Sequence, residues 1–230
     1  MDYYPIRYSL KFDDGSAEEF SLRLDPNSLV LLDPPPDPVP DWARLDCHRC
    51  ECCTLPTTTP LCPTAAHLAG VIGKFAHALR QEEAEVRVEM PERVVVMRSP
   101  VRLALSSLLG AYMAASGCPV LAALRPMVRF HLPFASEMET TWRAASMYLV
   151  AQYLRQRAGL KPEWDLGPLV EAYRRTQQVN FGMSRRMRQA ENQDAIDVLI
   201  LLDLFAQGVP ADIDGGLEEL RDLFEPWLQA

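Results

Sequence analysis

The sequence predicts an α+β fold: a small four-stranded antiparallel layer with one helix, followed by an all-helical C-terminal half. In the first hundred residues, apolar and polar side chains alternate over short stretches, which is typical of half-buried strands. From residue 99 onward, apolar side chains recur every three or four positions, as on the buried face of a helix. The proline-rich run 33–40 and the cysteine-rich segment after it show neither period.

Two β-hairpins are expected in the N-terminal part. Alternation covers residues 6–12 and 20–24, on either side of the turn sequence Asp13-Asp14-Gly15-Ser16. The second hairpin covers residues 85–97, with its turn at Met90-Pro91-Glu92. Between the hairpins, apolar side chains at three- and four-residue spacing predict a helix over residues 63–81.

These elements divide the chain between residues 98 and 99. Residues 1–98 are expected to form a ββ-(Cys loop)-αββ layer whose loop, residues 47–63, binds a metal. Residues 99–230 are expected to form a helical bundle that packs on the first part as one unit.

The helical half is expected to begin at Ser99-Pro100, because a capping serine precedes a proline at the first helical position. Cys118-Pro119 predicts the start of a shorter helix. Ser136 and Glu139 form a capping box for a helix that reaches Ala158, with Trp142, Leu149, Tyr153 and Leu154 pointing inward. Further helices are expected over 165–189, 192–207 and 216–228, separated by Gly208-Val209-Pro210 and Gly215-Gly216.

The composition excludes several classes of protein. The 230 residues carry a formal charge of −8, which argues against general binding to nucleic acids or acidic membranes. The N-terminus lacks the pattern of a signal peptide, and apolar stretches such as residues 198–202 are far shorter than the ~20 residues of a membrane helix. We therefore expect a cytoplasmic protein without membrane contact, with a protein partner or a homo-oligomeric state.

Five of the six cysteines crowd into residues 47–62. Thiols stay reduced in the cytoplasm, so such crowding indicates a metal or redox site more than a set of disulfides. Two Cys-x-x-Cys pairs overlap, Cys47/Cys50 and Cys50/Cys53, and thiolates at this spacing can grip one tetrahedral ion. Cys62 precedes a proline at a helix start, where the helix dipole favours the thiolate. His48, Cys47, Cys52 and Cys118 are the candidates for the fourth ligand.

Three interpretations of this segment are open. Structural zinc would staple a loop that has little secondary structure of its own. An iron–sulfur cluster also suits Cys-x-x-Cys followed by a later Cys-Pro, although the full ferredoxin spacing is missing. The segment could also hold free thiols or a redox pair, with Cys52 and Cys53 as a vicinal dithiol.

The second unusual stretch is residues 125–143, which contains His131. If Cys118 and His131 lie close together, they could form a nucleophile–base pair, and they are the candidate catalytic residues. A hydrogen-bonded loop histidine is the simpler interpretation. The arginines between Arg174 and Arg188 form a basic stripe that is expected to be a solvated helix face.

Two motifs of the chain resemble an uncharacterised bacterial family known only as a domain of unknown function. The first is His48-x-Cys50-x-x-Cys53 with Cys62-Pro63, and the second is SGCPVL at 116–121 with RPMVRFHLPFA at 125–135. The resemblance covers nearly the whole chain and brings no known activity. It implies metal ligands at Cys50, Cys53 and Cys62, and it leaves Cys47 and Cys52 outside the pattern.

The sequence thus favours a metal-binding cytoplasmic protein with a binding or regulatory role and a structural Cys/His zinc site, rather than an enzyme. Its metal ligands are Cys50, Cys53, Cys62 and His48, with Cys118 or Cys47 as alternatives to the histidine. The alternative is an iron–sulfur or thiol-dependent redox protein or enzyme that uses Cys62, Cys118 and His131.

Overall fold

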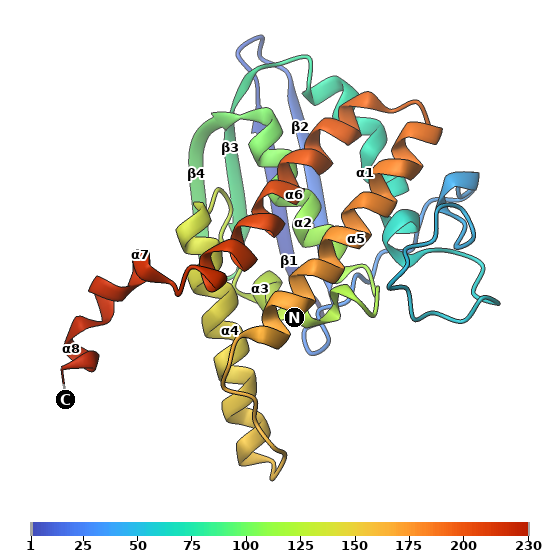
Figure 1. Cartoon of the computed structure of the whole chain (residues 1–230). Helices are drawn as coiled ribbons and strands as arrows, with labels where there is room; N and C mark the ends of the chain where they lie inside the picture. The colour runs from blue at the N-terminus through green and yellow to red at the C-terminus, as the bar shows by residue number, and fades with distance from the viewer. Residues whose placement is uncertain (1, 230) are drawn as a thin grey trace.

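A four-stranded antiparallel sheet forms one side of the molecule, and helices form the rest, as the α+β prediction expects (Figure 1). The computed structural model describes residues 2–229, apart from the side chain of Ala76. The strand order is β2-β1-β3-β4. The strands are β1 (Tyr4–Lys11), β2 (Ala17–Leu24), β3 (Glu83–Met90) and β4 (Arg93–Pro100).

Each predicted hairpin is present, and alternation explains which face of the sheet is buried. On β1, Ile6, Tyr8 and Leu10 are fully buried, while Arg7 and Ser9 between them lie on the other face of the sheet and are more accessible. Tyr8 pairs with Phe20 of β2 on one side and with Val88 of β3 on the other. The sheet therefore has one apolar face, which the helices cover.

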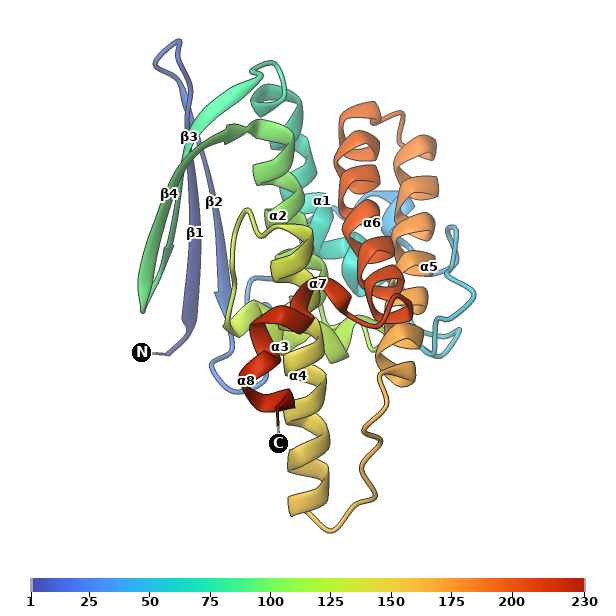
Figure 2. The same cartoon turned by 60° about the vertical axis from the view of Figure 1, so that its left-hand side comes forward.

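The helices cover this apolar face in two layers. Figure 2 shows α1 and α2 against the sheet, with α5 and α6 on their far side. The longer helices are α1 (Pro63–Ala78), α2 (Val101–Ala115), α4 (Glu137–Arg157), α5 (Gly167–Gln189) and α6 (Gln193–Asp214). The short ones are α3 (Arg125–Arg129), α7 (Glu218–Arg221) and α8 (Glu225–Leu228).

One hydrophobic core runs through all three layers. It joins the inner face of the sheet to α1 and α2, and it includes Val179 and Met183 of α5 and Val198 of α6. A smaller cluster lies between α4, α5 and α6. No helix among residues 2–229 combines the length and the apolar character needed to cross a membrane.

The helix start predicted at Ser99-Pro100 is wrong by one residue. Ser99 pairs with Ala84 and Pro100 with Glu83, so β4 continues to Pro100 and α2 begins at Val101. The pairing partner β3 is long enough to hold these two residues in the ladder.

Two predictions in the helical half also need correction. No helix begins at Pro119: the chain makes a turn, and a short 3-10 helix follows at Leu121–Leu124.

The predicted break at Gly208-Val209-Pro210 is absent, because α6 continues to Asp214. A proline costs a helix one hydrogen bond, but here Val209 is fully buried, and this packing holds the helix together.

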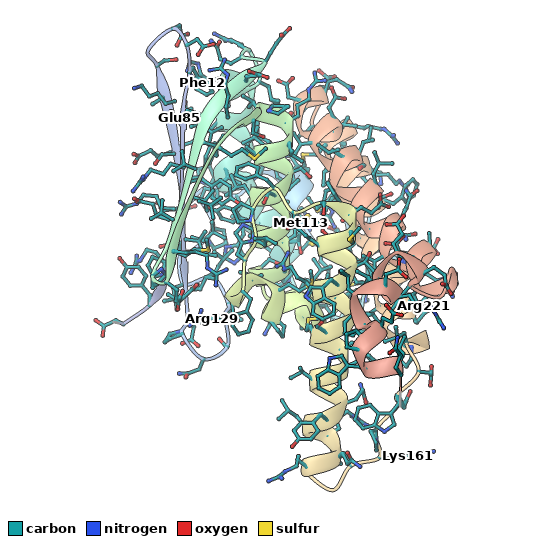
Figure 3. The ribbon with its side chains drawn as sticks, turned by 90° about the vertical axis from the view of Figure 1, so that its left-hand side faces the viewer. Phe12, Glu85, Met113, Arg129, Lys161 and Arg221 are labelled. Carbon is teal, nitrogen blue, oxygen red and sulfur yellow. The ribbon has the colours of Figure 1, made fainter. Side chains whose placement is uncertain are left out.

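The capping box that begins α4 is confirmed. The Ser136 side chain accepts a hydrogen bond from the Glu139 amide, and the Glu139 carboxylate accepts one from the Ser136 amide. The predicted inward face of α4 is wrong, since four large side chains are exposed: Trp142, Leu149, Tyr153 and Leu154. The C-terminal end of α4 projects beyond the other helices, and Figure 3 shows Lys161 in the loop that follows it.

Candidate functional site

The cysteine-rich loop is fastened at its two ends. A short 3-10 helix, Asp41–Ala43, leads into the loop. Just after it, Leu45 donates its amide proton to the Pro60 carbonyl over 3.0 Å. Cys62 donates its amide proton to the Ala43 carbonyl over 2.9 Å. The chain therefore leaves and returns at the same place, and Cys62 becomes the N-cap of α1.

The Cys-x-x-Cys sequence forms a tight turn within this loop. The Cys53 amide donates to the Cys50 carbonyl over 3.0 Å. The Arg49 side chain closes the turn from the outside, because its Nη2 donates to the carbonyls of Cys53 and Leu55 over 3.1 and 2.6 Å. The backbone therefore turns tightly between these two cysteines.

The charges of Cys52, Cys62 and Cys118 all act on the Cys50 thiol, and we call Cys50, Cys52, Cys62 and Cys118 the thiol cluster. Burial raises the pKa of Cys50 to about 12, and charge on Cys62, Cys52 or Cys118 would raise it further. Burial likewise raises the pKa of Cys62, with a smaller contribution from Cys118. All four side chains pack on the main hydrophobic core or within it.

Cys118 reaches the cluster from the far end of α2. The hydroxyls of Thr64 and Ser116 lie 3.0 Å apart, which joins the first turn of α1 to the end of α2. Gly117 has φ +87°, a conformation that glycine adopts without strain, and it lies beside Pro63. The turn thus brings Cys118 next to Cys62, which is 56 positions earlier.

The other predicted ligands lie outside the thiol cluster. The Cys47 thiol lies 3.2 Å from Oε1 of Gln189. His48 has φ +44° and lines an open polar groove with Arg174 and Phe181 of α5. Cys53 ends the turn that begins at Cys50, and its charge acts on Cys52. The set implied by the resemblance, Cys50, Cys53 and Cys62, stays a prediction.

The thiols are not in a coordinating arrangement. Within residues 2–229, no three Cys, His, Asp or Glu side chains are placed so that they could hold a metal ion. A metal would have to draw the sulfurs of the thiol cluster together. Zinc and the iron–sulfur cluster both stay predictions.

Arg186 of α5 is a fully buried charged residue beside the cluster, and the charge of Arg175 also acts on Cys52. Arg186 is 1% exposed, and its Nη1 donates to the carbonyls of Trp42 and Arg44 over 2.5 and 2.6 Å. Nη2 donates to the Leu45 carbonyl over 3.4 Å, and Nε is buried without a partner. No carboxylate of residues 2–229 pairs with it. Its positive charge partly offsets the rise in pKa that burial causes at both Cys50 and Cys62.

A family model for a domain of unknown function, DUF6901, matches residues 6–225. The chain belongs to the DUF6901 family. This confirms the resemblance to an uncharacterised family over nearly the whole chain. No curated protein and no solved structure matches.

In this DUF6901 chain, His131 lies away from the thiols. Its Nε2 is 2.5 Å from the Tyr8 hydroxyl, which is also 3.0 Å from the Ser107 hydroxyl. Burial, together with the charge of Arg143, lowers the pKa of His131 to about 3, so the imidazole is neutral. Its hydrogen-bond partner is Tyr8 rather than Cys118, which fits a buried, satisfied histidine better than a catalytic base.

Arg186 departs from the expectation that the basic stripe of α5 is a solvated helix face. Arg185 and Arg188 are indeed exposed, but Arg186 faces the loop. A usable signal was present: Val179, Met183 and Arg186 follow one another at spacings of four and three, so Arg186 continues the buried face of α5.

Gly182 is the point at which α5 meets the cluster. A Cβ atom at this position would lie 2.8 Å from Sγ of Cys50 and 3.4 Å from the His48 carbonyl oxygen. We expect Gly182→Ala to destabilise the protein by about 1–3 kcal/mol through overpacking. Gly73→Ala in α1 is the matched control, since nothing lies within 4 Å of its Cβ position. Because alanine favours a helix over glycine, this control should stabilise by about 0.5–1 kcal/mol.

Urea denaturation of the two variants and the wild-type protein measures this difference. Opposite signs for the two substitutions would support close packing of α5 on Cys50. Equal stabilisation by both would mean that the loop does not contact α5 at Gly182.

Proposed function

We propose that this protein binds a metal ion through cysteine thiolates, with Cys50, Cys62 and Cys118 as ligands and Cys52 as the fourth. Zinc is the proposed metal, because it accepts four thiolates in a closed tetrahedral site. The ion would join the cysteine-rich loop to the start of α1 and the end of α2. Its role would therefore be structural, within a binding or regulatory protein.

The observation that carries this proposal is the unpaired charge of Arg186. A buried guanidinium without an anionic partner is unfavourable, and three carbonyl dipoles satisfy only part of its hydrogen-bonding capacity. Four thiolates around Zn²⁺ carry a net charge of about −2. A metal–thiolate centre would thus supply the negative charge that Arg186 lacks.

The protonation of the thiols agrees with this assignment. Without a metal, burial keeps the pKa of Cys50 near 12, so this thiol is protonated and inert at neutral pH. A coordinated thiol is deprotonated outright, because the charge of the ion outweighs the cost of burial. Metal binding should therefore release protons, and the site should weaken as the pH falls.

An iron–sulfur cluster is the second candidate, since an all-cysteine donor set without His48 serves such a cluster as well as zinc. A catalytic thiol is less well supported, because Cys118 and Cys62 are buried and His131 is bonded to Tyr8. We also propose a cytoplasmic location, where the thiols stay reduced. The expectation of a protein partner or a second copy stays open to test.

Metal titration of the chelator-treated, reduced protein tests the proposal. Cobalt(II) reports tetrahedral thiolate coordination by its visible absorption and is displaced by zinc. We expect one ion per chain in the wild-type protein and a loss of affinity of at least tenfold in Cys50→Ser, Cys62→Ser and Cys118→Ser.

Cys47→Ser is the matched control, because Cys47 belongs to the same loop but lies outside the cluster. It should bind cobalt as the wild-type protein does. A loss in Cys47→Ser and Cys53→Ser with none in Cys118→Ser would contradict the proposed ligand set and support two Cys-x-x-Cys pairs instead.

A further inference from the structure

A cavity of about 170 Å³ lies between α2, α3, α4, α5 and α6, and none of the six cysteines lines it. Its walls are mostly apolar, with Leu121, Leu202 and Phe205 among them. Met113, which also lines it, lies in the interior between the sheet side and the outer helices (Figure 3). A cavity of roughly 150 Å³ with apolar walls accepts a molecule the size of benzene, so this one suits a single ring or a short acyl chain.

Arg143 of α4 brings a positive charge to this apolar space. Its Nη2 donates to the carbonyls of Met127 and Phe130 over 2.8 and 3.1 Å. No carboxylate of residues 2–229 pairs with it. The charge of Glu139 reaches Arg143, but Oε2 of this carboxylate already accepts the Ser136 amide proton.

Among residues 2–229, Arg143 is the one Lys, Arg, Asp or Glu residue that lines the cavity. His131 lines it as a neutral imidazole, since burial and Arg143 together hold its pKa at about 3. The electrostatics of the cavity therefore favour an anion over a cation.

Asn180 of α5 shows that the cavity wall contains an unsatisfied polar atom. It is 1% exposed, and its Nδ2 donates to Oδ1 of Asp203 over 2.9 Å. This bond sets the orientation of the amide and leaves Oδ1 buried with no hydrogen-bond partner. Buried polar atoms are rarely left without a partner, and a carbonyl oxygen needs a donor, so this atom points to a water molecule in the cavity beside any ligand.

The geometry points to a binding site for a small monocarboxylic acid with an apolar body, the carboxylate on Arg143 and the ring or acyl chain among Met113, Leu121, Leu202 and Phe205. A guanidinium binds a carboxylate through parallel hydrogen bonds, and Arg143 uses only Nη2 in its bonds within the protein. The apolar walls take up the rest of the molecule. This site is independent of the thiol cluster and of any metal there.

Calorimetric titration of the full chain with benzoate tests the inference, with benzyl alcohol as a neutral ligand of the same shape. Because a hydrogen bond to a charged group is worth about 1.5–3 kcal/mol, benzoate should bind about tenfold to a hundredfold more tightly than benzyl alcohol. Arg143→Met should remove this preference. Arg157→Met, an exposed position on the same helix, should keep it.

A second variant keeps the test valid if Arg143→Met does not fold. Ala135 lines the cavity and is half-buried, so a phenylalanine there should occupy part of the cavity, and Ala135→Phe should abolish benzoate binding in a folded protein. Equal affinities for benzoate and benzyl alcohol, or unchanged benzoate binding in Ala135→Phe, would overturn the assignment. So would the absence of benzoate binding to the wild-type protein at millimolar concentration.

Discussion

Arg186→Met is expected to destabilise the protein by about 1–3 kcal/mol, because buried carbonyls are left without a hydrogen-bond donor. Methionine fills a similar volume but donates no hydrogen bonds. The carbonyls of Trp42, Arg44 and Leu45 would lose their common donor. The loop would then detach from α5, and the thiols would lose the positive charge beside them.

Arg188→Met, two residues further along α5, is the matched control. Arg188 is exposed, so its replacement should change the free energy of unfolding by no more than about 0.5 kcal/mol. Arg186→Lys should fall between the two, because a lysine keeps the charge but cannot reach three carbonyls in a fork. Equal stabilities of Arg186→Met and Arg188→Met in urea would show that the buried arginine does not hold the loop.

Acidification is expected to weaken the fold through His131. The pKa of His131 is about 3 in the folded chain, against an ordinary value near 6.5. Below pH 6.5 the unfolded chain binds a proton that the folded chain refuses, so the stability that this group contributes is complete above pH 6.5 and falls as the pH drops toward 3. The slope is about 1.4 kcal/mol per pH unit, or roughly 3 kcal/mol between pH 6.5 and 4.

His131→Gln isolates this contribution from other groups that titrate in the same range. His67, whose pKa burial also lowers, is unchanged in the variant, as are the carboxylates. Glutamine can still accept the Tyr8 hydroxyl proton but does not titrate. The difference in unfolding free energy between the two proteins should therefore shrink as the pH falls. Parallel pH curves would mean that His131 is not buried as a neutral imidazole.

The features that the sequence predicted correctly are set by local interactions. The alternation of Ile6, Tyr8 and Leu10 determines which face of β1 is buried, and the Ser136–Glu139 box needs only four consecutive residues. The exposed face of α4 could not be predicted in this way, because periodicity identifies an apolar stripe but not whether anything covers it. Trp142 and Leu149 lie on such a stripe and are exposed.

The candidate site was predictable only in part, for the same reason. Cys50 and Cys62 stand out by their spacing, and the Cys-x-x-Cys turn is local. The approach of Cys118 depends on the hydroxyl pair that joins α1 to α2. The burial of Arg186 depends on backbone carbonyls that are far away in the sequence. The Leu45 carbonyl, for example, is 141 positions earlier, and no local sequence pattern can reveal such a contact.

The metal content of the protein purified under reducing, oxygen-free conditions without chelators tests the central claim most directly. Elemental mass spectrometry against the protein concentration should give about one zinc per chain for the wild-type protein and little for Cys62→Ser. Iron with acid-labile sulfide in place of zinc would support the cluster instead. A well-folded protein that carries neither metal, with all six thiols free to react on unfolding, would contradict the account.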